Sequence, residues 1–187
     1  MKKEKLLSCL LLSLSVLYSM QANAKIVWDF EDCKIGQTFK MWNAFGSEAA
    51  TSSAVVEADP KNPNNKVLHV IVKEWNTFVE FTLPEELAGH KLTDNVKSVK
   101  LNFYRPNSDS DNWKQFHVFL GNESLFQDEG YPYQGDHDVW QSKEYYLAPV
   151  TESANDERMF RLGIHHDNSD YYIDNLVLDK YPVHYTH

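Results

Sequence analysis

The chain has 187 residues, of which 42% are hydrophobic, 24% charged and 13% aromatic, and its formal net charge at pH 7 is −9. An acidic chain of this kind lacks the basic surface with which proteins bind nucleic acids and anionic membranes. The composition therefore excludes both as main partners and leaves a globular, aromatic-rich domain to explain.

The first 24 residues have the pattern of a signal peptide. Three lysines within the first five residues precede an apolar run over 6–17, and Ala22-Asn23-Ala24 matches a small-residue cleavage site. We expect export, with cleavage after Ala24, to the periplasm, the cell surface or the medium. A retained membrane anchor is disfavoured because the run is short. A lipoprotein signal ending at Cys9 would leave no apolar core.

Cleavage leaves residues 25–187, a chain of 163 residues with 15 basic and 26 acidic side chains and a net charge of −11. This length is enough for one domain with its own core. Cys33 is then the only cysteine, so no intrachain disulfide forms. We interpret Cys33 as a small core residue in preference to a catalytic nucleophile.

Alternating apolar residues and turn signals predict an all-β chain. Strands are expected over 26–32, 51–58, 67–73, 77–83, 96–105, 115–121, 140–147, 159–165 and 170–179. The stretch 122–138 is expected to be irregular, residues 59–65 form a turn run, and 84–90 is helix-like for one turn at most. The stretch 36–46 holds several large apolar residues, some of which are expected in the core.

The alternation also predicts which side chains face the core. In 77–83, Val79, Phe81 and Leu83 share one face and Glu80 lies on the other. In 96–105, Val99, Leu101 and Phe103 point inward. The opposite face, with Tyr104, is polar and aromatic.

The closing strand, 170–179, carries large apolar groups on both faces, which predicts a central position. Asp174 interrupts one face, and a buried carboxylate needs a partner or a metal. An opening strand beside the closing strand would bring Glu31 close to Asp174. Two such carboxylates predict a site for a hard cation such as Ca²⁺.

The opening Phe30-Glu31-Asp32 with Gly36, and the closing YYIDNLVL of 171–178, resemble the galactose-binding-like jelly-roll carbohydrate-binding modules attached to bacterial xylanases and related glycoside hydrolases. The resemblance covers roughly residues 25–180 and includes the Trp-x4-Tyr-x-Leu pattern of 140–147. It implies a two-sheet antiparallel β-sandwich, stabilised by Ca²⁺, that binds plant polysaccharide. It also implies further calcium ligands in the turn run, where Asp59 and Asn65 are candidates; a solvated turn is the alternative.

Sugar rings pack on aromatic side chains, and amides, imidazoles and acids bind their hydroxyls. The candidate ligand-binding residues are expected on one polar sheet face and its rim: Tyr104, Gln115, His117, Tyr131 and Tyr133, with Trp75 and Trp113 as alternatives. Trp42 could serve as a sugar platform or pack in the core, and Trp140 is expected to pack against the sandwich.

No Gly-x-Ser-x-Gly elbow is present, and adjacent histidines at 165 and 166 would point to opposite faces of a strand. Glu74, Glu80 and Glu123 could supply the carboxylate pair of a small glycosidase, but scattered surface acids explain them equally. We therefore expect a non-catalytic module for xylan or another β-glycan, which either stands alone or is the N-terminal part or companion of a glycoside hydrolase such as a xylanase. The alternatives are a structural accessory domain without sugar binding and a small glycosidase.

Overall fold

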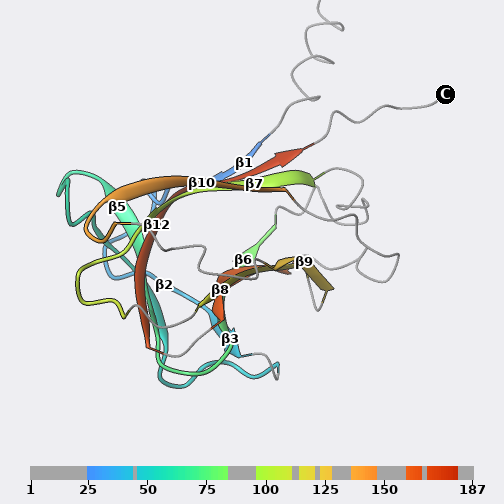
Figure 1. Cartoon of the computed structure of the whole chain (residues 1–187). Coiled ribbons are helices and arrows are strands. Elements are labelled where there is room, and N and C mark those ends of the chain that lie inside the picture. The colour runs from blue at the N-terminus through green and yellow to red at the C-terminus, as the bar shows by residue number, and fades with distance from the viewer. Residues whose placement is uncertain are drawn as a thin grey trace, which may run out of the picture.

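The computed structural model describes residues 25–43, 46–83, 96–110, 114–120, 123–127, 136–146, 159–165 and 168–180. These residues form twelve β-strands in two antiparallel sheets (Figure 1). The predicted all-β sandwich is thus confirmed. The described residues include no helix long and apolar enough to cross a membrane.

The larger sheet has seven strands in the order β10-β7-β12-β5-β4-β2, with β1 paired to β12. Its members are β1 (Ile26–Trp28), β2 (Thr38–Phe39), β4 (Ser53–Ala58), β5 (Lys66–Val72), β7 (Val96–Tyr104), β10 (Trp140–Tyr146) and β12 (Ser169–Lys180). The opening strand lies beside the closing strand, as the sequence predicted, and pairs antiparallel with Ile26 opposite Leu178. It ends at Trp28 and not at Asp32 as predicted, because Phe30 has a φ of 63° and the chain turns there.

The smaller sheet has five strands in the order β3-β6-β11-β8-β9. They are β3 (Met41–Asn43), β6 (Thr77–Thr82), β8 (Gln115–Leu120), β9 (Glu123–Gln127) and β11 (Met159–His165). Figure 1 shows this sheet as a separate layer facing β12 and β7. The short strand β9 lies in the segment 122–138, which the sequence predicted to be irregular, and no strand was predicted where β2 and β3 lie. Strands this short carry too little alternation to recognise.

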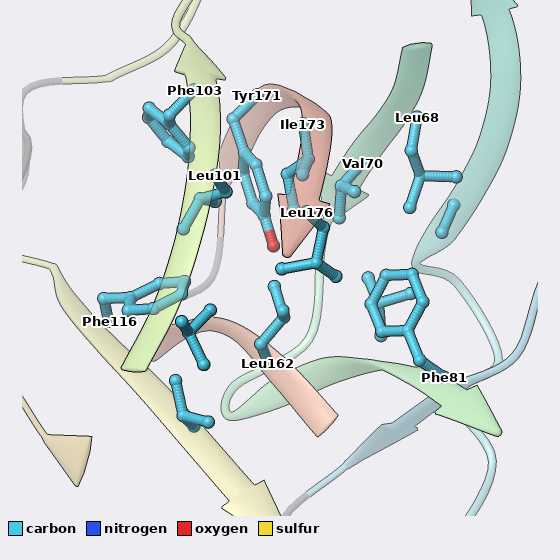
Figure 2. Close-up of a cluster of buried hydrophobic side chains, with 14 of the residues drawn as sticks. Leu68, Val70, Phe81, Leu101, Phe103, Phe116, Leu162, Tyr171, Ile173 and Leu176 are labelled. Carbon is cyan, nitrogen blue, oxygen red and sulfur yellow. The ribbon is translucent and has the colours of Figure 1, made fainter. Parts of the chain in front are cut away.

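The core lies between the two sheets and joins them in one cluster of buried side chains. Phe103, Tyr171 and Leu68 enter it from the seven-stranded sheet, and Phe81 and Leu162 enter it from the five-stranded sheet (Figure 2). Val79, Phe81, Val99, Leu101 and Phe103 all point inward, as the alternation predicted. Cys33 is partly buried and packs against the same cluster.

β12 is the central strand of the fold, because it pairs with β1, β5 and β7. Its register with β7 shifts between Asp174 and Val177, and Asn175 adopts a φ of 48°. This β-bulge changes the alternation. Leu176 therefore joins Tyr171 and Ile173 in the core, whereas uninterrupted alternation along 170–179 would place Leu176 on the face of Asp174, so alternation alone predicts its position wrongly.

A buried ionic cluster holds the loop after β7 against the start of β12. Asp109 accepts hydrogen bonds from Arg105 Nε and Lys114 Nζ, both at 2.5 Å, and from the backbone N of Asp170 at 2.9 Å. The three charged side chains are at most 4% exposed. Paired charges of this kind tolerate burial only as a set, so the loop has a defined position.

Candidate functional site

The sequence-predicted ligand residues divide between two opposite faces of the sandwich. Gln115 and His117 lie on β8, on the outer face of the five-stranded sheet, whereas Tyr104 lies on β7, on the outer face of the seven-stranded sheet. Trp75 is 49% exposed in the turn between β5 and β6. The remaining candidates, Trp113, Tyr131 and Tyr133, lie outside the described residues.

The outer face of the five-stranded sheet gathers rings and polar groups from four strands. We call it the aromatic face and define it by Trp42, Phe78, Glu80, Gln115, His117, Phe119 and Arg161. Trp42 lies opposite Phe78, and Arg161 lies between Glu80 and Phe119. The inner face of this sheet forms the core. On the outer face Phe78, Gln115 and His117 are buried, and Trp42 and Phe119 are half-buried, so a ligand would reach Trp42 and Phe119 first.

Three of these rings touch one another around Gly163. The centroid distances are 4.9 Å for Phe78–Phe119, 5.9 Å for Phe78–His117 and 5.6 Å for His117–Phe119. Gly163 pairs with His117, and a Cβ placed on it would lie 3.2 Å from Phe78 Cδ1. The missing side chain therefore lets the ring of Phe78 lie over the strand. His117 Nε2 lies 3.1 Å from Gln115 Oε1, within hydrogen-bond distance.

Beside this ring cluster, Arg161 joins an acid and an indole. Its guanidinium carbon lies 5.2 Å from the centroid of the Trp42 ring, within cation–π range. Its Nε lies 3.6 Å from Glu80 Oε2, which is an ion pair but too long for a hydrogen bond. Both side chains of the pair are only 11% exposed.

Two polar atoms of this group are buried without a hydrogen-bond partner among the described residues: the indole Nε1 of Trp42 and Oε2 of Glu80. One is a donor and the other an acceptor. A buried polar atom left without a partner costs about 1–3 kcal/mol. A ligand that both donates and accepts, as a sugar hydroxyl does, would offset that cost. The sequence left Trp42 between core and platform, and it did not single out Arg161.

The outer face of the seven-stranded sheet carries a row of rings that the sequence indicated only through Tyr104. Tyr104 contacts Trp140 at 5.4 Å and Tyr172 at 5.5 Å, and Tyr172 stacks on His69 at 4.1 Å. Trp140, expected to pack on the sandwich, does so on this outer face and donates to Asp59 Oδ1 at 3.1 Å.

This second row is covered. Lys61 lies 5.6 Å from the centroid of the Tyr104 ring and pairs with Asp138 at 2.7 Å, and Tyr104 donates its hydroxyl to Asp138. Tyr104 is only 2% exposed. Burial, followed by the bond to Asp138, raises the pKa of Tyr104 to about 12. The ring of Tyr104 is therefore closed to a ligand in this conformation.

The four residues predicted to bind calcium do meet at one corner. Asn65 Nδ2 lies 3.2 Å from Asp59 Oδ2 and 3.3 Å from Asp174 Oδ2. Burial raises the pKa of Asp174, and the charges of Asp59 and Glu31 raise it further, against the hydrogen bonds from Asn65 and Asn175. The predicted juxtaposition of Glu31 with Asp174 is thus present.

The donors at this corner do not form a metal-binding shell as they stand. Within the described residues no three His, Cys, Asp or Glu side chains are placed to hold a metal ion. Asp59 Oδ1 accepts from the Lys61 backbone N at 2.8 Å, and Asp174 Oδ1 accepts from the Asn175 backbone N at 2.7 Å. A carboxylate oxygen that accepts one N–H keeps a second lone pair, so these bonds do not decide whether Ca²⁺ binds, and the calcium site stays a prediction.

The chain folds as a two-sheet antiparallel jelly roll, and its smaller sheet has an aromatic outer face. Among solved structures, the xylan-binding module CBM15 matches with a TM-score of 0.55 and 8% identity, over 84% of this chain and 97% of that one. The C-terminal family 22 carbohydrate-binding module of Clostridium thermocellum Xyn10B matches with a TM-score of 0.52 and 10% identity, over 85% and 96%.

The Stig cyclase Fisc from Fischerella sp. TAU also matches, with a TM-score of 0.55 and 12% identity, over 86% of this chain and 100% of that one. No protein-family model matches the sequence, and neither does any curated protein. At these identities the likeness establishes the jelly-roll fold alone, which both sugar-binding modules and a cyclase share.

Proposed function

We propose that this chain is an exported, non-catalytic carbohydrate-binding module whose aromatic face binds xylan or another plant β-glycan. The observation that carries the proposal is the contact of Arg161 with Trp42 and Glu80 on a sheet face lined by rings, where Trp42 Nε1 and Glu80 Oε2 are buried without a hydrogen-bond partner among the described residues. Sugars present apolar C–H faces and paired hydroxyls, which is the chemistry that this face offers. The shared fold with xylan-binding modules supports the proposal.

In this proposal Trp42 and Phe119, which are half-buried, provide the surfaces on which pyranose rings pack, and Glu80 with Arg161 binds hydroxyls. His117 and Gln115 are 7% and 6% exposed and hold each other. In this proposal they position the rings of Phe78 and Phe119 and do not contact the sugar themselves. A neutral polysaccharide also suits a net charge of −11 better than a polyanion would.

Affinity electrophoresis of the protein in gels with xylan, mixed-linkage β-glucan, mannan or galactan tests the proposal. We expect retardation on one of these polymers and a loss of affinity of about tenfold or more in Trp42→Ala, because an aromatic anchor in a buried site dominates binding. Tyr146→Ala is the matched control, since Tyr146 is 63% exposed on the other sheet. It should bind as the wild type does.

Each contrary outcome points to a different function. No retardation of the wild type on any polymer would favour the structural accessory domain. If Trp42→Ala is still retarded and Tyr172→Ala is not, the binding site lies on the seven-stranded sheet and not on the aromatic face. Release of reducing ends by the pure protein would instead identify a small glycosidase.

A further inference from the structure

Lys66, the first residue of β5, inserts its ammonium group into the turn that follows β1. Lys66 Nζ donates to the backbone carbonyl of Glu31 at 2.5 Å and to that of Cys33 at 2.9 Å. The backbone N of the same lysine donates to Glu31 Oε1 at 3.0 Å. One side chain thus holds two carbonyl oxygens, and its own backbone holds the adjacent carboxylate.

The two carbonyls point to one place because the chain reverses there. Phe30 is buried and has a φ of 63°, a conformation that is rare for a bulky residue. The backbone N of Cys33 then closes the turn on the carbonyl of Phe30 at 3.0 Å. The two carbonyl oxygens converge on the ammonium of Lys66, and hydrogen bonds from a charged donor are the stronger kind.

We infer that the ammonium group of Lys66 supplies the positive charge at the turn after β1, and that it joins this turn to β5 in place of a bound metal ion. An ammonium group carries three donors on a compact charge, and two of them are accounted for by the two carbonyls. The inference concerns the stability of the fold and is independent of the proposed sugar binding.

The carboxylates of the predicted calcium corner also bind donors of the protein itself. Asp59 Oδ2 and Asp174 Oδ2 share the amide of Asn65, and Asp174 Oδ2 also accepts from Asn175 Nδ2 at 2.7 Å. A calcium ion that used these oxygens as ligands would compete with these N–H donors, and one that used the carbonyls of Glu31 and Cys33 would compete with the Lys66 ammonium. The corner is therefore satisfied by the protein's own donors.

The first test is thermal unfolding of the wild-type protein in excess EDTA and in millimolar calcium. We expect the same Tm in both, because a ligand that does not bind the folded state cannot shift the equilibrium. A Tm that falls in EDTA, or stoichiometric calcium retained after dialysis, would overturn the inference. This test uses only the wild-type protein, so it does not depend on whether a variant folds.

The second test compares Lys66→Met, which keeps the aliphatic stem and removes the charge, with Lys34→Met. Lys34 is an exposed lysine of the same segment and serves as the matched control. We expect the Tm of Lys66→Met to lie about 5 °C or more below that of the wild type, since charge-assisted hydrogen bonds are lost. Equal Tm values for the two variants would contradict the role of Lys66.

Discussion

His69 lies between two carboxylates on the outer face of the seven-stranded sheet. Its Nδ1 is 3.0 Å from Glu57 Oε2 and its Nε2 is 2.8 Å from Asp170 Oδ1, while its ring stacks on Tyr172. Burial lowers the pKa of His69, but the hydrogen bond that its ring donates to Asp170 and the charges of both carboxylates outweigh this effect, so the net shift is upward from 6.5. The folded protein therefore binds this proton more tightly than the unfolded chain.

A group whose folded pKa is raised stabilises fully below its unfolded pKa, and that stability is lost as the pH rises through the folded pKa. The free energy of unfolding of the wild type should thus fall above pH 6.5, by about 1 kcal/mol or less because Glu57 is 45% exposed. In His69→Gln this fall in the free energy of unfolding above pH 6.5 should disappear. Urea unfolding from about pH 5.5 to about pH 8.5 measures the difference.

A difference between wild type and His69→Gln that stays constant across this pH range would contradict the assignment, since a lost contact without a titrating proton has no such pH dependence. The stacking of His69 on Tyr172 was not predictable from the sequence. His69 and Tyr172 are 103 positions apart, and only the register of β5 with β12 makes them neighbours.

At the scale of the element, β11 shows how one residue shapes the aromatic face. Gly163 lies in the middle of this strand, next to His117 on β8. A Cβ on it would lie 3.0 Å from the carbonyl oxygen of Thr77 and 3.2 Å from Cα and Cδ1 of Phe78. The carbonyl belongs to the backbone of β6 and cannot move without shifting the strand.

Gly163→Ala should therefore destabilise the protein by about 1–3 kcal/mol, the usual cost of overpacking. It should also weaken polysaccharide retardation, because the ring of Phe78 must move. Urea unfolding and affinity electrophoresis measure the two effects. Thr82→Ala, an exposed change on β6, is the control and should stay within about 0.5 kcal/mol of the wild type.

Unchanged stability in Gly163→Ala would show that β6 and β11 adjust without strain. The sequence placed the strand at 159–165 correctly but gave no reason for a glycine in it. Side-chain alternation identifies which residues share a face of one strand. It does not identify what lies on the neighbouring strand, and the constraint on Gly163 comes from there.

For the whole molecule, the sequence predicted the class of fold and most of the strands. The inward series of 77–83 and 96–105 is confirmed, and so is the central position of the closing strand. Strand order was beyond its reach, because alternation is the same whichever strands pair. Tyr104 and His117 were therefore assigned to one polar face, although they lie on different sheets. The bulge at Asn175 was missed because it depends on a single backbone conformation.

The core predicts how the molecule unfolds. Leu162 is fully buried, lies opposite Val79 on β6 and Val118 on β8, and belongs to the cluster that also contains the inward residues of the seven-stranded sheet. Removing its side chain should cost about 2–5 kcal/mol, from lost burial and from the cavity left behind. Since neither sheet covers its own apolar face, both should lose structure together.

Leu162→Ala should therefore lower the urea midpoint while far-ultraviolet circular dichroism and tryptophan fluorescence still report coincident transitions. Val139→Ala, at a side chain that is 48% exposed, is the control and should change the free energy of unfolding by less than about 0.5 kcal/mol. Separate transitions for the two probes would mean that one sheet persists without the other. That outcome would contradict a single shared core, because a sheet that loses its partner exposes the whole apolar face that the partner covered.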